Sequence, residues 1–219
     1  MKILREFAIG ALCIGGYFGV RRLVWNERGQ RRAARNADRV VALEERLGLR
    51  IEPGVQRAAL RHQRLVDMLN VGYAVGNLTI SVGWLILLHH RRSPVFVRER
   101  RAVVAAYLGA LPVFLAFPAA PPRNRDDQVD TLLDRGIDLE HRMLVKLYNP
   151  IAAMPSHHVA FAVVTGFGMA RFARSPLTRA VGTVYPAAVA TVVVATGNHY
   201  TLDVIAGAAL GALARIATR

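Results

Sequence analysis

Cysteine is almost absent from this chain: its 219 residues include one, Cys13, which lies inside an apolar run. A single cysteine excludes an internal disulfide framework. Acidic residues are also scarce, because 15 Asp and Glu stand against 29 Lys and Arg. Nucleic-acid-binding proteins share such a basic excess, but here no basic stretch is interleaved with stacking aromatics and no zinc-finger spacing occurs. The sequence therefore predicts no nucleic-acid partner.

Hydrophobic residues make up 53% of the sequence and come in blocks separated by arginine clusters, without amphipathic periodicity. This alternation is typical of membrane-spanning helices whose basic loops face anionic headgroups. The blocks lie at residues 1–20, 69–88, 102–120, 156–172, 180–196 and 200–217. We therefore expect an all-α, polytopic integral membrane bundle of about six transmembrane helices in a multi-pass cell-membrane protein.

Two polar segments accompany these blocks. Residues 21–68 are rich in arginine and alanine with periodic apolar positions, which fits either a solvated helical linker or a membrane-surface amphipathic helix. Pro53-Gly54 is expected to break this segment into two pieces. Residues 126–148 mix acidic, basic and periodic apolar residues, and predict an amphipathic helix on the membrane surface. No A-x-A-like cleavage site follows the first block, so we expect an uncleaved anchor there.

Polar residues suited to phosphate chemistry begin two of the apolar blocks. In the stretch 155–158, Pro-Ser-His-His, Ser156 is a candidate helix cap, and a helix N-terminus suits an oxyanion. His199 and Asp203 stand four residues apart, so a helix would stack them on one face. An aspartate inside an apolar run is costly and needs a partner, for which His199 is the obvious candidate. Alternation of the spans puts both block starts, and the proline-rich exit 117–125, at one membrane face.

These residues resemble the type-2 phosphatidic-acid-phosphatase superfamily, especially its branch with inositol-phosphotransferase-like members. The resemblance rests on 155–158, on His199 with Asp203 and on the exit 117–123, and it covers roughly residues 66–217. It divides the chain into residues 1–68, an anchor helix with a basic interfacial segment, and residues 69–219, a membrane-embedded catalytic core.

The resemblance implies that His158 is the general acid, that His199 is the nucleophile and that Asp203 orients it. The residue chemistry agrees, because a histidine nucleophile must be neutral and held in one tautomer by a carboxylate on its other nitrogen. A second histidine protonates the departing alkoxide, which typically contributes about 10²–10⁴-fold. The implied reaction forms a phosphohistidine at His199 and needs no metal or other cofactor.

The expected substrate is a lipid or prenyl phosphate ester, since the site lies at the bilayer edge among membrane lipids. We expect hydrolysis, in which water takes the phosphoryl group. The alternative is a phosphotransferase that moves a phospho-headgroup, such as inositol phosphate, to an alcohol acceptor. The residues do not distinguish the two reactions, because both would use the same two histidines.

The basic residues depart from the family pattern. The lysine that usually precedes the Pro121-Pro122-Arg123 stretch is missing, and Val193 occupies a position that usually holds arginine. Because arginine neutralises phosphoryl oxygens with a well-suited fork geometry, we expect Arg123 to contact phosphate. The other candidates for the phosphate-binding set are Ser156, His157, Arg125, Arg142 and Lys146.

Two different functions remain open on the sequence alone. His157, His158, His199 and Asp203 are of the types that bind zinc. A non-catalytic membrane scaffold or lipid-binding protein is the other alternative.

The positive-inside rule puts the active face outside the cytoplasm, because the net charge of the 121–150 loop is −1 whereas the loops on the other side are basic. The basic segment 21–68 contradicts that orientation, and the oligomeric state is not indicated.

Overall fold

The structure is a computed structural model that describes residues 2–138, 141, 144–146 and 148–219. Over these residues the chain is all-helical and contains no named β-strand, which confirms the expected fold class. In chain order, the elements are α1 Lys2–Val24, α2 Glu27–Leu47, α3 Glu52–Leu60, α4 Gln63–Val71, η1 Gly72–Gly76, α5 Asn77–His90, α6 Phe96–Ala116, η2 Pro122–Asn124, η3 Leu133–Arg135, η4 Leu144–Lys146, α7 His157–Phe172, α8 Pro176–Ala195 and α9 Thr201–Ala217.

Helix α7 lies at the centre of the bundle and packs against α5, α6, α8 and α9. Glycines permit these close approaches. A Cβ atom added at Gly182 in α8 would lie 2.6 Å from the backbone nitrogen of Ala170, and one at Gly211 in α9 would lie 2.7 Å from the carbonyl oxygen of Ala160. Both are shorter than real contacts, so α8 and α9 approach α7 closely only where the side chain is absent.

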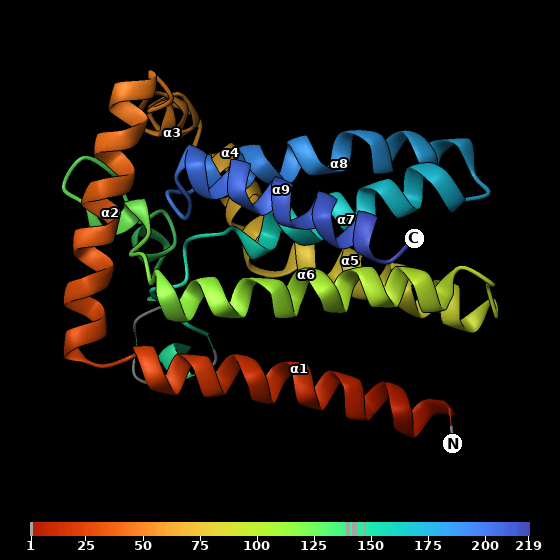
Figure 1. Cartoon of the computed structure of the whole chain (residues 1–219). Coiled ribbons are helices and arrows are strands. Elements are labelled where there is room, and N and C mark those ends of the chain that lie inside the picture. The colour runs from red at the N-terminus through yellow and green to blue at the C-terminus, as the bar shows by residue number, and fades with distance from the viewer. Residues whose placement is uncertain (1, 139–140, 142–143, 147) are drawn as a thin grey trace.

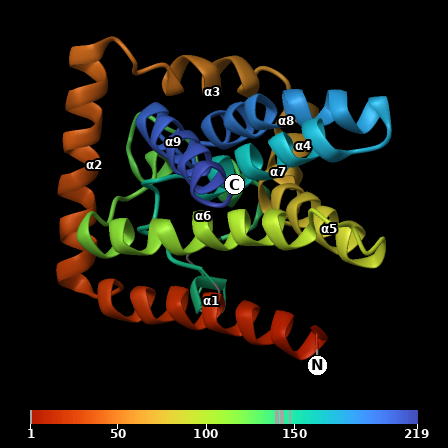
Figure 2. The same ribbon diagram turned by 45° about the vertical axis from the view of Figure 1, so that its right-hand side comes forward.

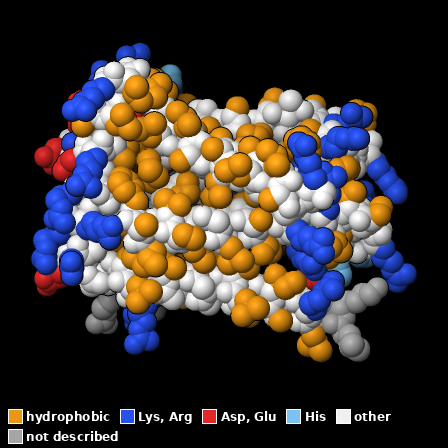
Figure 3. Space-filling view, in the orientation of Figure 1, with side chains coloured by type: hydrophobic (Ala, Val, Ile, Leu, Met, Phe, Trp, Pro, Cys, Tyr) orange, Lys and Arg blue, Asp and Glu red, His pale blue; other side chains and the backbone are white. Residues whose placement is uncertain are grey.

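Three helical stretches are long and apolar enough to cross a membrane among the described residues: Leu4–Val24, Gln63–His90 and Pro176–Ala195. Their outer surfaces carry exposed large hydrophobic residues, such as Phe7, Leu78 and Val184. Figure 3 shows hydrophobic side chains over the middle of one face and Lys and Arg towards both ends. Apolar surface of this extent indicates a membrane protein. The expected count of six spans is not confirmed, since α7 and α9 have only 16 and 17 residues against the roughly 20 that a bilayer needs.

The segment 21–68 is folded against the bundle, so the solvated linker is wrong. Helix α2 crosses the end of the bundle at which α6 ends and α9 begins (Figures 1 and 2). Its Ala37, Val40 and Val41 are buried against Tyr200 and neighbouring loop residues. The segment is amphipathic, as expected, but its apolar face covers protein.

The break in that segment also differs from the expectation. Helix α2 ends at Gly48, whose φ of 66° is the left-handed conformation that glycine adopts at helix ends. Pro53 lies in the first turn of α3, where the missing N–H costs nothing, so it helps to begin a helix instead of ending one.

The predicted surface helix over residues 126–148 is wrong for the described part of that segment. It forms an irregular loop that holds only the short turns η3 and η4. Oδ1 of Asp130 accepts hydrogen bonds from the amides of Leu132 and Leu133, both at 3.0 Å, and Gly136 ends η3 with φ of 77°. Aspartate side chains compete in this way for the amides that a helix would use.

Candidate active site

His199 and Asp203 form a buried pair at the start of α9. Nδ1 of His199 lies 3.4 Å from Oδ2 of Asp203, and the two residues are 5% and 0% exposed. The same Oδ2 accepts a hydrogen bond of 2.9 Å from the backbone N–H of Tyr200. The preceding turn reverses at Gly197, with φ of 71°, and the amide of His199 donates to the carbonyl of Val193 at 3.1 Å. Asp203 therefore caps its own helix and holds the imidazole.

The first residues of α7 meet this pair. Oγ of Ser156 accepts a hydrogen bond of 3.3 Å from the amide of Val159, which confirms the expected helix cap. The amide of Ser156 donates to the carbonyl oxygen of Asp203 at 3.0 Å, so the starts of α7 and α9 are joined directly. This junction brings the ring centroid of His158 to 5.8 Å from that of His199. The ring of His158 is stacked on Tyr73, at 4.7 Å.

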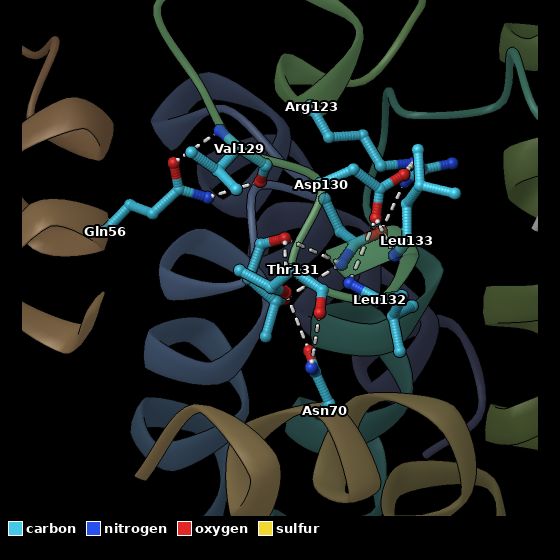
Figure 4. A network of polar contacts seen from close by, with 10 residues as sticks. Gln56, Asn70, Arg123, Val129, Asp130, Thr131, Leu132 and Leu133 are labelled. Carbon is cyan, nitrogen blue, oxygen red and sulfur yellow. Dashed lines mark hydrogen bonds and ion pairs between the residues drawn. The ribbon is translucent and has the colours of Figure 1, made fainter. Parts of the chain in front are cut away.

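Arg123 is the buried cation of the site. Its amide donates to the carbonyl of Gly197 at 2.8 Å, so the turn η2 is fixed beside the His199 turn. The guanidinium donates through Nη1 to Oδ1 of Asn198, and its Nε lies 3.3 Å from Oδ2 of Asp130. Figure 4 shows Arg123 and Asp130 side by side above Thr131. The side chain is 3% exposed, so its charge acts in a poorly solvated place.

The loop that carries Asp130 is held by paired side-chain contacts. Gln56 in α3 both donates to and accepts from the backbone of Val129, each at 2.8 Å. Asn70 in α4 makes a similar pair with Thr131, at 2.9 Å to its carbonyl and 2.7 Å from its hydroxyl (Figure 4). Segments distant in the sequence therefore fix the position of the Arg123 guanidinium.

These groups surround one cavity of about 340 Å³. His157, His158, His199 and Arg123 line it together. Sequence reasoning missed five other polar residues of its wall, Tyr17, Tyr73, Tyr148, Asn149 and Asn198. Asn198 stands next to His199 and was within reach of that motif, whereas nothing in the local sequence marks Tyr17, which comes from α1. Its hydroxyl accepts a hydrogen bond of 2.6 Å from the amide of Asn149.

The remaining candidates for phosphate binding lie elsewhere. Ser156 is fully buried in its cap and does not line the cavity. Arg125 pairs with Asp38 at 2.7 Å and lines a neighbouring pocket. Lys146 is exposed on η4 and is not part of the cavity wall, and Arg142 lies outside the described residues.

His157 reaches the cavity with only part of its ring. The imidazole is stacked on Tyr107 at 5.1 Å and on Phe161 at 5.3 Å, and it meets Phe114 edge-on at 4.8 Å. Its Nε2 lies 3.2 Å from the carbonyl oxygen of Tyr107. The ring is therefore held mainly as a wall of the cavity.

Burial keeps the His199 ring neutral. It lowers the pKa of His199 from 6.5 to about 3, and the positive charge of Arg123 acts in the same direction. A neutral imidazole with its Nδ1 on Asp203 leaves a lone pair on Nε2, which is the form that a nucleophile requires. Among the residues that the structure describes, no group of three or more His, Cys, Asp or Glu side chains is placed to hold a metal ion.

The fold and the site define a class: a helical membrane protein in which loops and helix ends bring histidines and an arginine to one cavity, with a buried aspartate beside His199. The family model of the PAP2 superfamily matches residues 38–217, and the chain belongs to that superfamily. Its members are generally phosphatases, so membership of the superfamily suggests phosphatase-type phosphoryl transfer. No curated protein and no solved structure matches the chain.

Proposed function

We propose that this protein hydrolyses a lipid or prenyl phosphate ester at the membrane face through a phosphohistidine on His199. The observation that carries the proposal is the shared cavity, in which the His199–Asp203 pair faces His158 and the buried cation Arg123. Apolar helices around this cavity favour a substrate that resides in the bilayer.

In the proposed first step, Nε2 of His199 attacks phosphorus and the bond from phosphorus to the lipid oxygen breaks. Asp203 stabilises the positive charge that develops on the ring. Burial lowers the pKa of His158 to about 3, so its protonation requires the negative charge of the bound phosphate. In the substrate complex, protonated His158 gives its proton to the departing alkoxide. A water molecule then attacks the phosphohistidine while His158 removes a proton from it, which releases inorganic phosphate and restores neutral His199.

Two sets of donors are available for the phosphoryl oxygens. Arg123 supplies guanidinium N–H groups in the cavity wall. The first turn of α7 leaves the amides of His157 and His158 without partners inside the helix, and these two residues line the same cavity. Both sets are fixed in place before substrate binds, which favours charge developing in the transition state.

The finer assignments belong to the same proposal. Membership of the inositol-phosphotransferase-like branch would make an alcohol the acceptor in place of water, with the same two histidines. We propose the cell membrane as the location and the extracytoplasmic side as the active face, because the loops 89–101 and 171–179 are basic whereas 121–150 is not. The basic helix α2 lies on the side of the site and argues for the opposite orientation.

The proposal is tested by turnover of a panel of lipid phosphates with detergent-purified wild type and His199→Asn, in chelator, with and without inositol. Phosphate release by wild type alone supports metal-independent histidine catalysis. A new lipid product that requires the alcohol would instead identify a transferase. Equal behaviour of the two proteins across the panel would overturn catalysis and leave a lipid-binding or scaffold role.

A further inference from the structure

The start of α9 is held by three carboxyl groups from three helices. The amide of Tyr200 donates to Asp203 at 2.9 Å, that of Thr201 to Oε1 of Glu52 at 2.5 Å, and that of Leu202 to Oε1 of Glu44 at 2.7 Å. The three acceptors are at most 1% exposed. Consecutive amides of a helix start, which normally face solvent or a ligand, are therefore all taken by the protein's own acids.

Glu44 comes from α2, which crosses the end of the bundle, and Glu52 comes from α3, which lies along its side against α8 (Figure 2). Both lie before residue 66, where the resemblance based on sequence motifs begins, although the family model already matches from residue 38. The turn that they hold begins directly after His199, and it contains Asp203. Any shift of this turn moves the nucleophile and its orienting carboxylate together.

The carboxyl groups of Glu44 and Glu52 interact with each other, and one proton between them would satisfy both. The carboxyl group of Glu44 interacts with that of Glu52, yet Oε2 of Glu44 is buried without a donor to it among the described residues. Two ionised carboxylates in contact would repel each other in a poorly solvated place. A proton on Glu44 removes that repulsion and supplies the missing hydrogen bond.

We infer that Glu44 and Glu52 are positioning residues of the active site, which hold the His199–Asp203 turn through the amides of α9 and share one proton. The inference rests on the proposed function, since it assigns these acids to the same catalytic pair. Helices α2 and α3 therefore do more than cover the bundle, because they fix the position of the turn that holds His199 and Asp203.

The shared proton makes the site sensitive to alkaline pH. Burial, with the charges of Glu52 and Asp203, raises the pKa of Glu44 from 4.5 to about 8. Tyr200 also faces these acids. Because the folded state holds this proton more tightly than the unfolded chain, the resulting stability is complete below pH 4.5 and is lost as pH rises through about 8. Loss of activity in the same range is the expected consequence.

The experiment compares wild type, Glu44→Ala, Glu44→Gln, Glu52→Ala and the control Glu45→Ala in the full-length protein. Glu45 neighbours Glu44 but is half exposed and pairs with Arg50. We expect kcat to fall about 100-fold in the two alanine variants of the pair, since small displacements of reacting groups cost that much, with KM little changed. The glutamine keeps an acceptor for Leu202 and a donor towards Glu52, so it restores most of the loss. It also reduces the alkaline decline near pH 8, of which Asp203 keeps a part because burial raises its pKa to about 8 as well.

Amide hydrogen exchange over residues 198–204 gives a readout that does not need activity. We expect faster exchange in Glu44→Ala and Glu52→Ala than in wild type and Glu45→Ala. Activity that depends on His199 but is equal in Glu44→Ala and Glu45→Ala would overturn the inference and leave the proposed function standing. If no lipid phosphate is turned over, the proposed function fails, and unchanged exchange in the alanine variants would overturn the positioning role as well.

Discussion

Asp203→Asn isolates the orienting role of the carboxylate from its structural role. The amide of asparagine still offers an oxygen to the backbone N–H of Tyr200, which Asp203 holds at 2.9 Å. The helix cap therefore survives, and the substitution removes only the ionisable group beside Nδ1 of His199, whose pKa burial raises to about 8. A change in rate then reports on the histidine.

The magnitude follows from the His199–Asp203 contact. A hydrogen bond to a charged group is worth about 1.5–3 kcal/mol, which corresponds to roughly 10- to 150-fold in rate. The asparagine amide can also donate to Nδ1, which moves the ring proton to Nε2 and blocks the attacking nitrogen. A wrong tautomer costs about 10⁴-fold in the serine protease triad. Since the contact here is long, at 3.4 Å, we expect a fall in kcat of about 10³-fold, between these two limits.

The assay is the steady-state rate of phosphate release from the best lipid phosphate of the panel, with the melting temperature measured on the same samples. Asp67→Asn is the matched control, because Asp67 is half exposed and pairs with Arg135 away from the cavity. The reasoning is refuted if Asp203→Asn keeps the melting temperature of wild type and more than about a tenth of its kcat.

Three further substitutions test the binding group and the helix packing. Arg123→Lys keeps the charge but loses the guanidinium fork, so kcat/KM for the lipid phosphate should fall by about 10- to 100-fold; an unchanged value would remove Arg123 from phosphate binding. Glu99→Ala leaves Arg215, whose side chain is 7% exposed, without its buried carboxylate, so denaturant unfolding in detergent should show a loss of about 3–5 kcal/mol. Gly207→Ala places a Cβ atom 2.4 Å from a carbonyl oxygen at the start of α7, whereas Gly10 has open space. The melting temperature and kcat should both fall in Gly207→Ala, and neither should change in Gly10→Ala.

The sequence predicted those features that depend on neighbours along the chain. The apolar blocks form helices because intrahelical hydrogen bonds and burial act over single turns. Ser156 caps α7, and His199 meets Asp203, because their spacing of one turn was already contained in the sequence. The superfamily was also recognisable from these local motifs, and the family match confirms it.

Local rules failed where distant segments compete for the same backbone. Residues 126–148 have the periodicity of an amphipathic helix. Asp130, however, accepts from a downstream amide and pairs with Arg123. Gln56 of α3 and Asn70 of α4 also hydrogen-bond to this loop. The spacing of apolar residues in the sequence does not indicate such long-range side-chain contacts. The partly exposed Arg125 was likewise indistinguishable in sequence from the buried Arg123.

What the sequence determined by itself is the set of reactive groups and the helices that begin beside them. Only the tertiary structure decided which groups share a cavity, that Tyr17 of the first helix belongs to its wall, and that Glu44 and Glu52 close the start of α9. The physical reason is the range of the interactions. Caps and helix faces are set within one turn of chain, whereas a buried charge and a shared proton depend on side chains brought together from helices far apart in sequence.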